Sequence, residues 1–100
     1  MYHIPEEFFT KKNQRIHVAP GQEEIIYNAL LDTGHRVYFD FINFCKKWNN
    51  EDNYVLCFFD QAEKTVHING AATPDAKYEI YELEDLIEHE TDLHEILQLL

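Results

Sequence analysis

"YVLCFFD" at residues 54–60 and "TVHIN" at residues 65–69, separated by "QAEK", decide the fold of this chain. The first stretch is apolar on both sides of an extended chain, which is typical of a strand covered on both faces, or nearly so. In the second stretch Val66 and Ile68 alternate with polar residues, which indicates a half-buried strand. Because four residues separate the two stretches, they predict a β-hairpin.

Two further stretches extend this hairpin into a larger sheet. "RIHVA" at 15–19 alternates between apolar and polar residues and predicts a short strand, and "KYEIYEL" at 77–83 does the same. We expect 77–83 to follow the hairpin as the third strand of a small antiparallel β-meander of three or four strands. With helices before and after the meander, residues 1–100 are expected to form a single α+β domain.

The first helix is expected near 22–33. Pro20 and Gly21 make a turn, acidic residues follow in the first helical turn, and apolar residues then recur at helical spacing. Gly34 supplies the left-handed residue that ends such a helix.

The second helix is expected at 41–49. Asp40 is a good N-cap for it. The preceding residues, 35–40, fit either a brief strand or an earlier start of the helix near Arg36. The spacing i, i+3, i+4, i+7 that places residues on one helix face is met by Phe41, Phe44, Cys45 and Trp48.

The acidic C-terminal run predicts helix over 84–99. In one straight helix Glu90 would fall in the middle of the leucine stripe, where a lone buried carboxylate costs several kcal/mol. We therefore expect a helix near 84–89, a break at 90–91, and a second helix near 92–99. Asp92 with Glu95 has the spacing of a capping box for that second helix.

"HETDLHE" at 89–95 is close to the H-E-x-x-H signature of zinc proteases, but its spacing differs. His89 and His94 are five residues apart, which separates them by roughly 140° around an unbroken helix. They therefore diverge instead of gripping one ion, and solvated histidines in an acidic helix are the better interpretation. His17 and His67 lie on polar faces of predicted strands and would meet only if those strands were neighbours. No metal or other cofactor is expected.

Catalysis is also not expected. The chain contains no serine, and its three glycines do not form a phosphate-binding loop. Cys45 and Cys57 sit inside apolar patterns, which predicts reduced, inert core thiols in a cytosolic protein.

Charge is distributed unequally along the chain. The first fifty residues hold six acids and six bases, whereas the second fifty hold thirteen acids and two bases, so the net charge of −11 belongs to the second half. Such a charge opposes direct binding of nucleic acid or of an anionic membrane. It favours either a basic protein partner or solubility alone. No apolar run is long enough to span a membrane and the start does not resemble a signal peptide, so a cytoplasmic location is expected, in a host cell if the chain is phage-encoded.

These features predict a small, non-catalytic inhibitor or binding protein. Its acidic C-terminal half would dock on the basic, nucleic-acid-binding surface of a partner protein such as a nuclease. Phage anti-defence inhibitors, DNA mimics and immunity proteins share this profile of a short, acidic chain without catalytic motifs. Tyr78 or Tyr81 would be exposed and anchor the contact. The residues expected to bind the partner are Glu79, Tyr81, Glu82, Glu84, Asp85, Glu88, Asp92 and Glu95.

An alternative hypothesis is a structural or assembly module. The chain ends in "ILQLL" at 96–100, and Leu99 lies away from the main leucine stripe of the predicted helix. Surplus leucines on a terminal helix often complete a homodimer or dock on a larger subunit.

Overall fold

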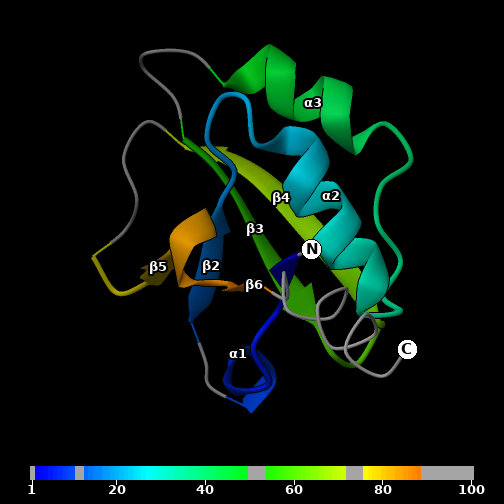
Figure 1. The fold of residues 1–100 in the computed structure, drawn as a ribbon, viewed down its shortest axis with the longest axis vertical. Helices are drawn as coiled ribbons and strands as arrows, with labels where there is room; N and C mark the ends of the chain where they lie inside the picture. Colours follow the sequence, from blue (N-terminus) through cyan, green and yellow to red (C-terminus); the bar gives the residue numbers. More distant parts are fainter. Residues whose placement is uncertain (1, 11–12, 50–53, 72–75, 89–100) are drawn as a thin grey trace, which may run out of the picture.

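The computed structural model describes residues 2–10, 13–49, 54–71 and 76–88. In chain order its elements are β1 (Tyr2–His3), α1 (Glu7–Thr10), β2 (Gln14–His17), α2 (Glu23–Asp32), α3 (Phe41–Trp48), β3 (Tyr54–Asp60), β4 (Thr65–Ala71), β5 (Glu79–Tyr81), a 3₁₀ turn (Leu83–Asp85) and β6 (Ile87–Glu88). The main sheet has four strands in the order β4-β3-β2-β5, with α2 and α3 packed on one face (Figure 1). The general α+β class is therefore confirmed.

The β3–β4 hairpin forms as predicted. Seven residue pairs join the two strands, from Tyr54 opposite Ala71 to Asp60 opposite Thr65. In the connecting turn the Asp60 carboxylate accepts a hydrogen bond of 3.1 Å from the Glu63 N–H, and Lys64 adopts a positive φ of 54°. The alternation of apolar residues therefore set both the position and the register of this hairpin.

The predicted antiparallel meander is wrong, because the sheet is mixed. β5 does not continue the meander beside β4. It crosses to the other edge and pairs parallel with β2, with Gln14 opposite Glu79 and Ile16 opposite Tyr81. In this position the Tyr81 ring enters the core and packs edge-on against Phe8 of α1, with ring centroids 5.1 Å apart. The alternation at 77–83 indicated a strand but did not specify its neighbour.

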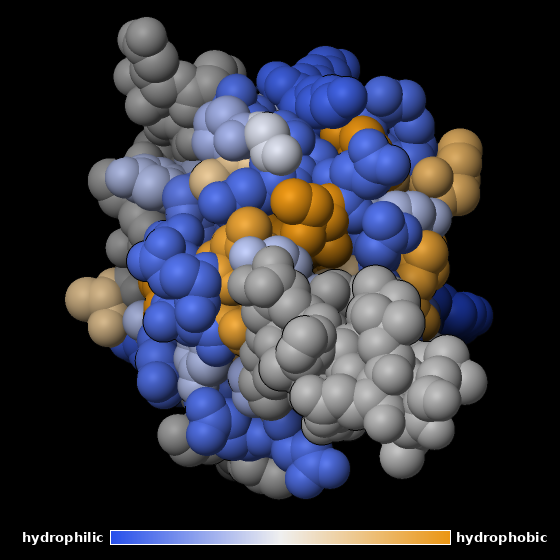
Figure 2. All heavy atoms as spheres, in the orientation of Figure 1, coloured by the Kyte–Doolittle hydropathy of each residue, from blue (hydrophilic) through white to orange (hydrophobic). Residues whose placement is uncertain are grey.

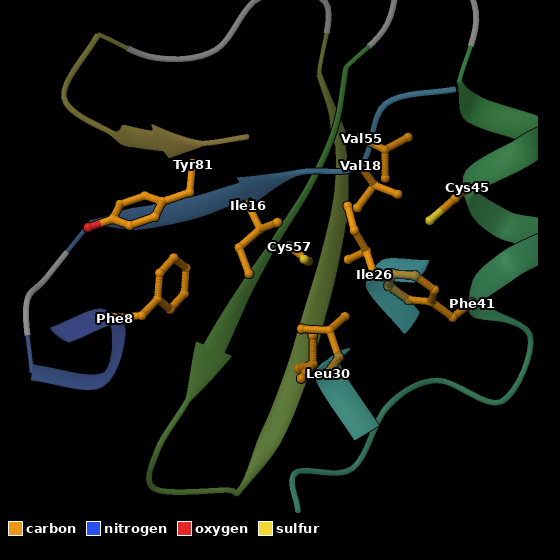
Figure 3. Close-up of a cluster of buried hydrophobic side chains, with 11 residues drawn as sticks. Phe8, Ile16, Val18, Ile26, Leu30, Phe41, Cys45, Val55, Cys57 and Tyr81 are labelled. Carbon is orange, nitrogen blue, oxygen red and sulfur yellow. The ribbon is translucent and has the colours of Figure 1, made fainter. Parts of the chain in front are cut away.

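The core lies between the sheet and the two long helices (Figure 3). Both cysteines are free and contribute to it, as expected. Figure 2 shows hydrophilic side chains over most of this face, with hydrophobic side chains exposed near its middle; Ile25 and Leu31 of α2 are among the exposed apolar residues. Fully buried side chains come from all of the central elements: Ile16, Val18, Ile26, Leu30, Phe41, Cys45, Val55 and Cys57.

Helices α2 and α3 match the predictions within one or two residues. Gly34 takes a positive φ of 81° just after α2, in agreement with the expected left-handed stop. Asp40 precedes α3, but its carboxylate makes no cap to the helix backbone and instead accepts a hydrogen bond of 2.8 Å from the Asn43 side chain. Segment 35–40 is neither strand nor helix. Its one pairing is a parallel bridge between Arg36 and Thr65.

The helix predicted near 84–89 is wrong. Residues 83–85 form a single 3₁₀ turn, and Leu86 is extended and buried. Residues 87–88 then pair as β6 with β1 at the N-terminus, Tyr2 opposite Glu88. This long-range pairing overrides a local helical pattern, and it also gives the N-terminal strand that the sequence did not predict. The break at 90–91 and the helix at 92–99 lie outside the described residues. Within the described part of the chain, no helix is both long and apolar enough to cross a membrane.

Candidate functional site

Four of the predicted binding residues gather at one edge of the main sheet. Glu79 comes from the edge strand β5, Glu82 follows that strand, and Glu84 and Asp85 belong to the 3₁₀ turn. Glu79, Glu84 and Asp85 are exposed, and the side chain of Glu82 is 41% exposed. We call these four residues the acidic edge.

A pocket of about 360 Å³ opens on the acidic edge. Glu79 and Asp85 line it, and a third carboxylate comes from Glu7 of α1, more than seventy positions away along the chain. Ile80 and Tyr81 complete the lining. Because three carboxylates border a small pocket, it is suited to a positively charged group.

Tyr81 is not the exposed anchor that the sequence predicted, since only 7% of its surface is exposed. It lies on the core side of β5, where Phe8 covers its ring, while its hydroxyl reaches the pocket and donates a 3.4 Å hydrogen bond to a Glu7 carboxylate oxygen. Burial, followed by the charges of Glu79 and Glu7, raises the pKa of this hydroxyl. Tyr81 therefore forms part of the pocket and stays protonated.

Tyr78, the other predicted anchor, is half-buried and lies immediately before β5. The Arg15 guanidinium lies 4.0 Å from the Tyr78 ring centroid and 4.1 Å from that of Phe58. Phe58 in turn stacks on His67 at 5.1 Å. These contacts make a row from Tyr78 across β2, β3 and β4, in which Tyr78 and Phe58 hold Arg15 by cation–π interactions. This row could not be predicted, because its members come from four separate stretches of the chain.

Hydrogen bonds connect the acidic edge to β2, since Gln14 contacts Glu79 and His17 contacts Glu82. His17 Nδ1 lies 2.8 Å from a Glu82 carboxylate oxygen. His67 of β4, the strand at the opposite edge of the sheet, lies 3.4 Å from Asp60. The two histidines do not meet, because β3 runs between their strands. Within the ranges that the structure describes, no group of three or more histidine, cysteine, aspartate or glutamate residues could hold a metal ion.

The thiols of Cys45 and Cys57 are both buried. Burial raises the pKa of Cys45 to about 12, with a smaller contribution from the charge of Glu23. Burial also raises the pKa of Cys57. Since the thiolate is the reactive form, neither side chain is a nucleophile at neutral pH.

The remaining predicted residues are not placed at the acidic edge by the structure. Glu88 lies in β6, away from the main sheet. Asp92, Glu95, the histidines of "HETDLHE" and the terminal leucines lie outside the described residues. Glu7 was missed, since nothing in the sequence brings the N-terminus next to 79–85.

Comparisons with protein-family models, with curated proteins and with solved structures found no match. Function is therefore inferred from the geometry of this chain.

Proposed function

We propose that the protein is a small, non-catalytic inhibitor that docks its acidic edge on a basic, nucleic-acid-binding surface of a partner protein such as a nuclease. In this mode of action it resembles phage anti-defence inhibitors, DNA mimics and immunity proteins. Two reduced, buried thiols favour a cytoplasmic location, in a host cell if the chain is phage-encoded.

One observation carries the proposal: carboxylates from three elements converge on one pocket at a sheet edge. Like charges repel, and bringing Glu7, Glu79 and Asp85 together costs stability unless something offsets it. A basic side chain of the partner would do so.

In the proposed complex the exposed carboxylates and the pocket would have different roles. The exposed carboxylates Glu79 and Glu84 would steer the approach of a positively charged partner and raise the association rate. The pocket would then take a lysine or arginine side chain from the partner. Arginine suits it better, because five N–H donors in a fixed fork can satisfy several carboxylate oxygens at once.

The test is capture of the partner from native-host extract on immobilised protein. The variant Glu79→Lys/Glu84→Lys reverses the acidic edge at two exposed positions. Its matched control, Glu24→Lys/Glu63→Lys, makes the same change in net charge at exposed positions on α2 and in the β3–β4 turn. We expect the wild type and the control to retain a basic partner that rising salt releases, and the edge variant to lose it. Equal capture by both variants would refute the proposal.

A further inference from the structure

Among the residues that the structure describes, no strand pairs with the outer edge of β4. β4 is seven residues long, and residues 65–71 include no charged residue and no proline. Natural proteins usually protect edge strands with charges, prolines, bulges or short length, because unpaired backbone groups otherwise template pairing with another chain. β4 contains neither a charged residue nor a proline, and it is not short.

The backbone groups that point outward from β4 can be identified. The Val66 N–H donates to the Arg36 carbonyl at 2.8 Å, away from β3. Because successive residues of a strand point their backbone groups to opposite sides, the N–H and C=O groups of Ile68 and Gly70 also point outward. No hydrogen bond within the described part of the chain uses them. The Arg36 bridge therefore covers only the beginning of this edge.

An aromatic strip lies beside the open edge, made of Tyr38, Phe39, Phe44 and Trp48. Phe39 is 86% exposed, Tyr38 47% and Trp48 43%. At roughly 200 Å² per ring these three expose about 350 Å². A specific dimer buries about 800 Å² per partner, so the strip supplies a large share of such an interface.

We propose that β4 pairs with β4 of a second copy of this chain, antiparallel and centred on Asn69, to form a continuous eight-stranded sheet. In this register Ile68 of each copy lies opposite Gly70 of the other. These are the residues with free outward groups, so the two pairs exchange four backbone hydrogen bonds.

The side chains complement each other in the same register. Trp48 packs over Gly70, with a ring atom 3.2 Å from the position that a Cβ would take there. A second copy therefore brings its own Trp48 next to Ile68. Beside Ile68 lies a pocket of about 350 Å³, lined also by Tyr38, Phe44, Val66 and His67. Its lining is mostly apolar, which suits an indole ring. The glycine, the tryptophan and the pocket thus fit a second copy.

The charge distribution permits this pairing in spite of a net charge of −11. Of the described bases, Arg36, Lys46, Lys47 and Lys64 lie on the elements that flank β4. The acidic edge lies three strands away, about 14 Å, which exceeds the Debye length of about 8 Å at physiological ionic strength. In the dimer the two acidic edges lie at opposite ends of the eight-stranded sheet, where each remains accessible to a partner protein.

Asn69→Cys, made in the whole 100-residue chain, tests the register directly. Residues directly opposite in a pair without hydrogen bonds have Cα atoms about 4.5 Å apart, within disulfide range. Asn69 is exposed, and Cys45 and Cys57 are buried, so only the new thiols can react. We expect oxidation to give a disulfide-linked dimer. Ala62→Cys, exposed in the β3–β4 turn, is the control and should stay monomeric. Failure of Asn69→Cys to cross-link above the level of this control would overturn the proposal.

Sedimentation of the unmodified protein over a range of concentrations gives the second test. We expect a monomer–dimer equilibrium, and for Asn69→Lys a dissociation constant raised at least about tenfold, because two ammonium groups then face each other across the dimer axis. Ala62→Lys makes the same charge change away from the axis and should dimerise like the wild type. A protein that is monomeric throughout would overturn the proposal and leave this edge to an extended peptide of another protein. These outcomes are independent of the capture test on Glu79 and Glu84.

Discussion

The two edges of the main sheet differ in length, charge and cover. β5 is three residues long, is flanked by carboxylates, and is held to the body by the buried Tyr81. β4 is seven residues long, is uncharged, and lies beside the aromatic strip, in which three rings are exposed. We propose that the first edge attracts a basic surface and that the second edge pairs with another strand. One small sheet therefore offers two surfaces of opposite character.

The largest expected effect is on the attachment of β5. Tyr81→Ala removes the side chain that fixes β5 against Phe8, and we expect it to lower the free energy of unfolding by about 3 kcal/mol, the cost typical of removing a buried aromatic ring. Tyr81→Phe should cost less than about 1 kcal/mol, because its one hydrogen bond is long. Urea denaturation measures both. Similar losses for the two variants would mean that the hydroxyl, and not the ring, holds β5.

At the β4 edge, loss of the Trp48 ring should lower the free energy of unfolding about half as much as loss of the Tyr81 ring. Trp48 is 43% exposed, so Trp48→Ala should cost only about 1.5 kcal/mol in the monomer. The same substitution should abolish the concentration-dependent dimer, which Tyr81→Phe should leave intact. Denaturation and sedimentation of the same samples separate the two effects. A Trp48→Ala protein that dimerises normally would remove the distinction between the edges.

The smallest effects are on the pH dependence of stability, and the two sides of the sheet should respond to opposite pH changes. On the β5 side, the raised pKa of Tyr81 gives a contribution that is complete below the ordinary value of about 10 and is lost as pH rises through the folded pKa. Tyr81→Phe should therefore flatten the alkaline loss of stability.

On the β4 side, the hydrogen bond from the Glu63 N–H, together with His67, lowers the pKa of Asp60. That contribution is present above about pH 4 and is lost as pH falls through the folded pKa. Asp60→Asn should therefore flatten the acid loss and leave the alkaline one unchanged. Denaturation curves of the three proteins from pH 3 to pH 11 check both signs, and a variant that changed the slope at the wrong end would contradict the assignment.

The parts of the fold that the sequence predicted are those set by local pattern. The β3–β4 hairpin, α2 and α3 each follow from apolar spacing within one stretch. β5 and β6 do not, since alternation at 77–83 indicates a strand without naming its neighbour, and pairing of 87–88 with β1 joins the two ends of the described chain. Contacts between distant stretches decide such cases, and a single sequence does not display them.

The candidate site divides in the same way. Glu79, Glu82, Glu84 and Asp85 were predicted because they lie in one acidic run. The burial of Tyr81 was not, because Ile80 and Tyr81 are consecutive and only one of them can face the core. Phe8 decides between them by covering Tyr81. Glu7 enters the pocket from the same distant element, α1, so one unpredicted helix accounts for both differences.

The most direct test of the central claim is the salt dependence of the association rate with the captured partner. If the acidic edge steers binding, the rate should fall steeply as salt rises for the wild type and for Glu24→Lys/Glu63→Lys. For Glu79→Lys/Glu84→Lys the rate at low salt should be at least about tenfold lower, with a shallower slope. Parallel slopes for all three proteins would contradict the claim and leave the carboxylates as a solubilising surface.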